Sequence, residues 1–144
     1  NFWTRLSWRK KTIGFLLGIL VVVWLGQLTY ETGIEILLRQ RGASVWRKSG
    51  RVAGLDFGKE SHFGDSDIGW VTRLGGLESL DLSFTQVTST GVEQLLNCRH
   101  LTSLSVLPEQ ITPEQERRLK TELPHLMVDQ IVIVDGRRVR KDFQ

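Results

Sequence analysis

The feature that most constrains this chain is an apolar run, residues 12–30, in which no side chain is charged. At about 1.5 Å per residue, a helix of this length spans roughly 28 Å, close to the roughly 30 Å hydrocarbon core of a bilayer. Trp24 and Tyr30 lie toward one end, and Trp3 and Trp8 precede the other, as interfacial aromatic residues do. The run predicts one transmembrane helix over residues 12–30, after a basic flank of residues 1–11.

Two other interpretations of this run are a buried core helix and a cleaved signal peptide. Charge-free runs of this length are rare in the core of so small a protein. Basic residues precede the run as in a signal peptide, but no small-residue cleavage site follows it. We therefore favour an uncleaved anchor. Gly14 and Gly18 have the small-xxx-small spacing that lets membrane helices approach closely.

The charges around the run predict its orientation. Four basic residues and no acidic one precede it, whereas Glu31 and Glu35 separate it from the four basic residues that follow. The positive-inside rule then predicts a cytoplasmic N-terminus and an extracytoplasmic, periplasmic C-terminal domain.

A leucine frame, LxxLxL, recurs in the rest of the chain. Copies begin at Leu77, Leu101 and Leu123, and a weaker one begins at Val52. Downstream apolar positions recur every 24 residues in four series: Phe63, Val87 and Ile111; Ile68 and Val92; Val71, Leu95 and Leu119; Leu74 and Cys98. We interpret residues 52–128 as a short α/β leucine-rich-repeat solenoid of about three to four units, with parallel strands and convex helices.

Residues 80–95, LDLSFTQVTSTGVEQL, carry a family resemblance. They resemble bacterial leucine-rich repeats with the pattern LDLSxTxVTxxGLxxL, which are abundant in planctomycete-like genomes and are similar to the cysteine-containing subclass. Cys98 occupies the cysteine position of that subclass, where Leu74 stands one unit earlier. The resemblance covers roughly residues 34–128. It implies a binding role and supplies no catalytic residues.

Both ends of such a solenoid need a cap. Residues 31–51 predict a helix with Ile34, Leu37 and Leu38 on one face, ended by Gly42, and then a hairpin turning at residues 48–50. Residues 129–144 predict a second hairpin, because Asp135-Gly136 separates two strand-like runs. This hairpin either covers the open end of the core, which we favour, or presents a basic edge strand to a partner.

Outward strand positions predict a concave face that contacts another protein, with a merely solvated face as the alternative. The predicted ladders are Gly54, Ser79, Ser103 and His125; Asp56, Asp81, Ser105 and Met127; and Gly58, Ser83, Leu107 and Asp129, with Phe84 beside the third. Docking through an end or the convex side is also open.

No residue pattern indicates a chemical site. His62, Asp65 and Asp67 match no metal-site spacing, and Asp65 is more simply a helix N-cap. Cys98 is expected to be a small buried apolar residue. The net charge of +3 comes without an aromatic-interleaved basic patch, which argues against a nucleic-acid partner. We expect no cofactor, no metal and no enzymatic activity.

These patterns favour a membrane-anchored protein–protein interaction module, an accessory or structural subunit of a membrane complex. Its expected partners are the bilayer, through residues 12–30, and another membrane-associated protein. The alternative is an anchor and sensor fragment of a larger signalling or enzymatic membrane protein, which the absence of Met at Asn1 suggests.

Overall fold

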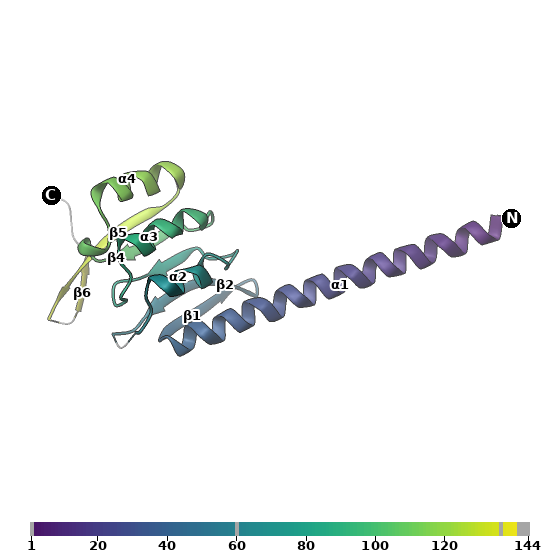
Figure 1. Cartoon of the computed structure of the whole chain (residues 1–144), viewed down its shortest axis with the longest axis horizontal. Coiled ribbons are helices and arrows are strands. Elements are labelled where there is room, and N and C mark those ends of the chain that lie inside the picture. Colours follow the sequence, from purple (N-terminus) through teal and green to yellow (C-terminus); the bar gives the residue numbers. More distant parts are fainter. Residues whose placement is uncertain (1, 60, 136, 141–144) are drawn as a thin grey trace. The chain divides into compact units, whose positions relative to one another are not determined.

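A computed structural model describes residues 2–59, 61–135 and 137–140, with only the backbone described for residues 2–16 and 27–29 (Figure 1). The chain divides into two compact units, Asn1–Gly33 and Ile34–Gln144. The second unit is a mixed α/β structure around a six-stranded sheet that does not close.

The first unit consists of one helix, α1 (Phe2–Gln40), whose last residues belong to the second unit. Within it, Leu17–Gln40 is long and apolar enough to cross a membrane, and only 7% of its most apolar window is buried. The interpretation as a buried core helix is therefore wrong. The described large apolar side chains that are exposed in Leu17–Gln40 are Leu17, Ile19, Leu20, Val21, Val22, Val23, Trp24, Leu25, Tyr30, Ile36 and Leu37.

The predicted juxtamembrane helix is not separate but is the end of α1. Ile34 and Leu38 are buried in the core of the second unit, whereas Leu37 is exposed. Glu35 is also buried there, and its carboxylate accepts hydrogen bonds from Arg39 and Arg47. Ile34, Glu35 and Leu38 thus form the face of the last turns of α1 that packs in the second unit, while Ile36 and Leu37 are exposed.

The strands of the sheet follow one another in chain order, from β1 to β6. Their bounds are β1 Ala43–Lys48, β2 Arg51–Phe57, β3 Ser79–Asp81, β4 Ser103–Val106, β5 Met127–Val134 and β6 Arg137–Arg140. β2 to β5 are parallel, and the antiparallel β1 and β6 complete the two edges. Both predicted hairpins are present: Ser49 and Gly50 turn between β1 and β2 with positive φ, and Asp135 lies between β5 and β6.

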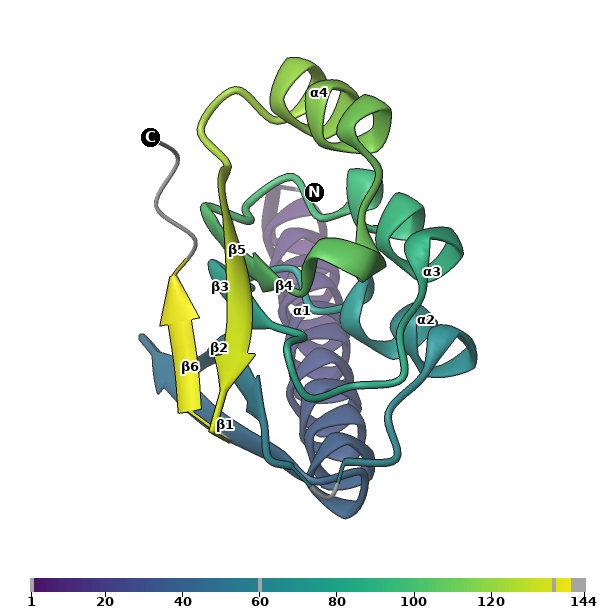
Figure 2. The same ribbon diagram turned by 90° about the vertical axis from the view of Figure 1, so that its left-hand side faces the viewer.

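Short helices connect the parallel strands along one side of the sheet (Figure 2). They are η1 Asp65–Asp67, α2 Ile68–Val71, α3 Ser89–Glu93, η2 Gln94–Asn97, η3 Pro108–Gln110 and α4 Pro113–Glu122. The core lies between these helices and the sheet. Every apolar residue of the four series spaced by 24 is buried there, with at most 6% of its surface exposed. The spacing therefore identified the core correctly.

Thr88 and Thr112 cap α3 and α4, and the side chains of Thr112 and Gln115 form a reciprocal capping box. Asp65, in contrast, is not an N-cap. Gly64 occupies that position in η1, and Asp67 accepts a hydrogen bond from its N–H at 3.1 Å. Asp65 is the first helical residue, which leaves its carboxylate available to the next connecting segment.

The leucine frame places the last parallel strand two residues too early. Leu104 pairs with Val128, 24 residues later, rather than with Leu126. Leu126 is buried before β5 begins. The strands therefore pair according to the 24-residue spacing. The LxxLxL frame that begins at Leu123 lies two residues before the register that this spacing sets.

Candidate functional site

Two rows of side chains cross the face of the sheet opposite the helices. The register places Trp46, Gly54, Ser79, Ser103 and Met127 side by side, and we call them the first row. The second row is Ser44, Asp56, Asp81, Ser105 and Asp129. Neighbouring strands are about 4.8 Å apart, so the side chains of one row project together.

The predicted ladders agree with these rows on β2, β3 and β4 and differ on β5. Met127 belongs to the first row and Asp129 to the second. His125 lies in the turn before β5, where it lines an open pocket with Arg99 and Glu122. Its predicted outward strand position is therefore wrong, for the same two-residue displacement.

The third predicted ladder does not form. β3 ends at Asp81 and β4 ends at Val106, so Ser83 and Leu107 lie beyond the strands. Ser83 is buried, with 1% of its surface exposed, instead of facing outward. Its backbone N–H and its hydroxyl both donate to Oδ1 of Asp81, at 2.9 and 2.6 Å. Ser83 thus orients the carboxylate of Asp81.

The first row is small and polar in the middle and apolar at its two ends. Trp46 and Met127 are 46% and 67% exposed. The indole ring of Trp46 lies over Gly54, where any side chain would overlap it. The row therefore offers two large exposed apolar groups separated by the hydroxyls of Ser79 and Ser103, a mixture common at protein contact surfaces.

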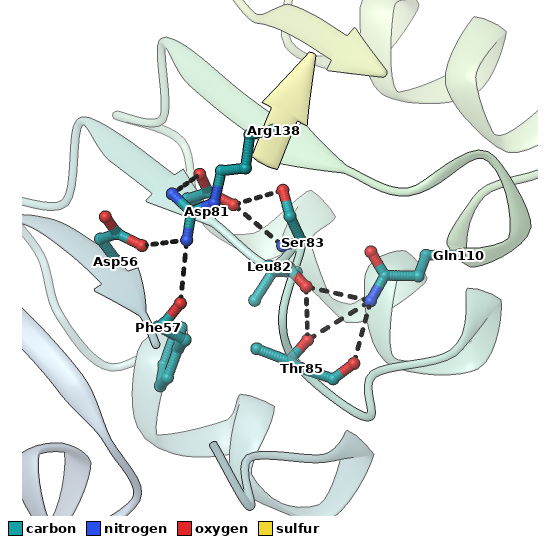
Figure 3. A network of polar contacts seen from close by, with 8 residues as sticks. All are labelled: Asp56, Phe57, Asp81, Leu82, Ser83, Thr85, Gln110 and Arg138. Carbon is teal, nitrogen blue, oxygen red and sulfur yellow. Dashed lines mark hydrogen bonds and ion pairs between the residues drawn. The ribbon is translucent and has the colours of Figure 1, made fainter. Parts of the chain in front are cut away.

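The second row is occupied by an arginine from β6 (Figure 3). Arg138 donates to Oδ2 of Asp81 and to Oδ1 of Asp56, both at 2.7 Å. It also donates to the carbonyl oxygen of Phe57 at 3.0 Å, and its guanidinium lies 4.5 Å from the ring centroid of Phe84. Burial alone would lower the pKa of Arg138, but the hydrogen bond to Asp56 and the two carboxylate charges raise it.

A second arginine of β6 repeats this contact at the other end of the row. Arg140 donates to Oδ2 of Asp129 at 2.9 Å. Alternate residues of a strand point to the same face, which is why Arg138 and Arg140 both reach the row. All three carboxylates of the second row are thereby paired with arginines of β6.

No family model, curated protein or solved structure matches the chain.

The remaining candidate residues lie apart from the two rows. Among the described residues, no three His, Cys, Asp or Glu side chains lie close enough to hold a metal ion. His62 is exposed, and Asp65 and Asp67 bond to Thr88 and to Gly64. Cys98 is buried, and burial raises the pKa of its thiol to about 11.

Of the two glycines predicted to pack against another membrane helix, the structure describes the surroundings of Gly18 alone. Gly14 lies in the part of α1 of which only the backbone is described. A side chain at Gly18 would meet no atom within 4 Å, so a neighbouring helix has room to approach there.

Arg138, Arg140 and Trp46 are the contributors to the site that the sequence did not identify. The sequence did contain one indication of the two arginines. Side chains alternate between the two faces of a strand, so Arg138 and Arg140 lie on the same face of the predicted second strand of the hairpin. The carboxylates that Arg138 contacts on β3 and β2 lie 57 and 82 residues away in the chain, whereas Arg140 contacts Asp129 on β5, 11 residues away.

Proposed function

We propose that this chain is a short leucine-rich-repeat module, held at a membrane by α1, that binds another protein through its first row. The observation that carries the proposal is the exposed first row, with Trp46 and Met127 at its ends. Its in-register side chains form a continuous surface, as the concave ladders of leucine-rich-repeat proteins do.

The leucine-rich-repeat assignment is supported by two observations. Residues spaced by 24 or 25, such as Leu55, Leu80 and Leu104, pair directly across parallel strands. The apolar residues that recur between the strands are all buried. Both are expected when each unit of a repeat packs on its neighbours.

The membrane assignment is supported by the exposure of the apolar side chains from Leu17 to Leu25. Exposed apolar area of this extent is unfavourable in water and favourable in lipid. Following the positive-inside rule, we place the N-terminus in the cytoplasm and the sheet on the periplasmic side. In this role the chain serves as an accessory or structural subunit that holds a membrane-associated partner.

Site-specific photo-crosslinking in native membranes tests this function. A photoreactive amino acid at the position of Met127, in the first row, should yield one adduct of defined mass in the membrane fraction. The matched control is Arg117, which is exposed on α4 on the opposite side. Equal adducts from both positions, or none from Met127, would contradict binding through the first row.

A further inference from the structure

The second row has the composition of an arginine-binding site. Two carboxylates from neighbouring strands, a backbone carbonyl and an aromatic ring all contact the guanidinium of Arg138. Guanidinium groups are recognised in this way, by several acceptors in the plane and a ring against the face. Asp81 is already oriented by Ser83, so that the site is in part formed independently of the arginine.

The spacing of the carboxylates extends this recognition to a second arginine. Asp129 lies on β5 and binds Arg140, two residues after Arg138. A strand with arginines at positions i and i+2 therefore pairs with all three carboxylates of the second row.

β5 belongs to the sheet, whereas β6 contacts this row through the polar groups of Arg138 and Arg140. The apolar side chain of β6, Val139, is 48% exposed, and Val132, which pairs with it on β5, is exposed as well. Nε of Arg138 is buried and, among the described residues, has no hydrogen-bond partner. β6 is thus an imperfect ligand for its own site, with little apolar burial to retain it.

We propose that the second row is a binding site for an extended segment bearing Arg-x-Arg, and that β6 occupies it in cis until a partner's segment takes its place. The inference rests on the proposed function, because it names the chemistry of the partner that reaches the same face. The favoured role of the hairpin as an end cap is thereby extended, since the hairpin also regulates access to the second row.

A ligand in cis competes at a high effective concentration, on the order of millimolar for short connections. The apparent affinity of a peptide in trans is then its intrinsic affinity multiplied by the fraction of molecules from which β6 has left the site. Removing the arginines of β6 should therefore reveal the site.

The test measures binding of a fluorescent hexapeptide with the sequence of residues 135–140 to the full chain in detergent micelles, by anisotropy. The Arg138→Ala/Arg140→Ala variant should bind it at least ten-fold more tightly than the unmodified chain. Adding Asp56→Asn and Asp81→Asn should remove that gain. Arg137→Ala, an exposed neighbour on the same strand, should behave like the unmodified chain.

Three results would overturn the proposal. One is equal or absent binding by the unmodified chain and the Arg138→Ala/Arg140→Ala variant, with unchanged circular dichroism showing that both are folded. Another is equal binding of a peptide with lysines in place of its last two arginines, which would indicate charge attraction without recognition of guanidinium. The third is a dimer of the unmodified chain that the variant abolishes, which would make a second copy the occupant. Each result leaves crosslinking from Met127 unaffected, so failure here is distinguishable from failure of the proposed function.

Discussion

Asp65 accepts two hydrogen bonds from Thr88, which lies 23 residues later at the start of the next connecting helix. Oδ1 accepts from the backbone N–H at 2.7 Å, and Oδ2 accepts from the hydroxyl at 2.6 Å. Since Thr88 also caps α3, this pair joins two successive connections. Asp65→Ala should lower the free energy of unfolding by about 1–2 kcal/mol, measured by urea denaturation in micelles. Ser66→Ala, an exposed neighbour, should leave stability unchanged, and equal effects of the two substitutions would contradict this contact.

Gly91 is predicted to be intolerant of any side chain. A Cβ there would overlap Oδ1 of Asp65 and lie 2.8 Å from Cγ1 of Val87. Gly91→Ala should therefore destabilise the fold by about 1–3 kcal/mol, despite the higher helix propensity of alanine. Gly69→Ala is the control, because a Cβ at Gly69 would meet nothing within 4 Å. A thermal melt in which Gly91→Ala is as stable as Gly69→Ala would be inconsistent with this packing.

Gln110 is a buried amide that links two connecting segments. Its Nε2 donates to the carbonyl oxygens of Leu82 and Val87 at 3.0 and 3.1 Å, and its Oε1 accepts from the N–H of Leu107 at 2.7 Å. Gln110→Ala removes the side-chain partner of the Val87 carbonyl and of the Leu107 N–H, whereas the Leu82 carbonyl still accepts from Thr85, and the substitution should cost about 2–3 kcal/mol. Gln86 lies 24 residues earlier and is exposed, so Gln86→Ala should change stability by less than about 0.5 kcal/mol. Similar losses in the two variants would count against this role of Gln110.

Cys98 should titrate abnormally. Burial raises its pKa from 9.0 to about 11, because the buried thiolate is unfavourable. The protonated thiol therefore stabilises the folded state fully below about pH 9, and this contribution is lost as the pH rises toward 11. The Cys98→Ala variant should lack that part of the pH dependence. Iodoacetamide should label the native chain at pH 8 far more slowly than the urea-unfolded chain, and equal rates would show that the thiol is accessible.

The sequence predicted the core well because the core is periodic. Phe63, Val87 and Ile111 occupy equivalent places, and a constant spacing brings such residues together whatever the detailed path of the chain. The two hairpins were predictable from their turns, since Ser49-Gly50 and Asp135-Gly136 favour the positive φ that a tight turn requires.

The site itself was only partly predictable. The LxxLxL frame correctly predicts the members of the first two ladders on β2, β3 and β4. Their members on β5 depend on whether this frame or the 24-residue spacing sets the register. The burial of Ser83 depends on where β3 ends. The contact of Arg138 with Asp56 and Asp81 requires β5 to pair with β4 in its first half and with β6 in its second, which local patterns do not determine.

The contact between Arg138 and Asp81 underlies the occupied second row, and a double-mutant cycle measures it most directly. Both side chains are less than a third exposed. Asp81→Ala leaves Arg138 bonded to Asp56 and to the carbonyl oxygen of Phe57, and Arg138→Ala leaves Asp81 bonded to Ser83, so the cycle isolates the one contact between Arg138 and Asp81. Unfolding of the unmodified chain, Arg138→Ala, Asp81→Ala and the double variant should give a coupling energy of about 1–3 kcal/mol that falls only slightly with salt. A coupling energy near zero would contradict the placement of β6 on the second row and, with it, the binding site inferred there.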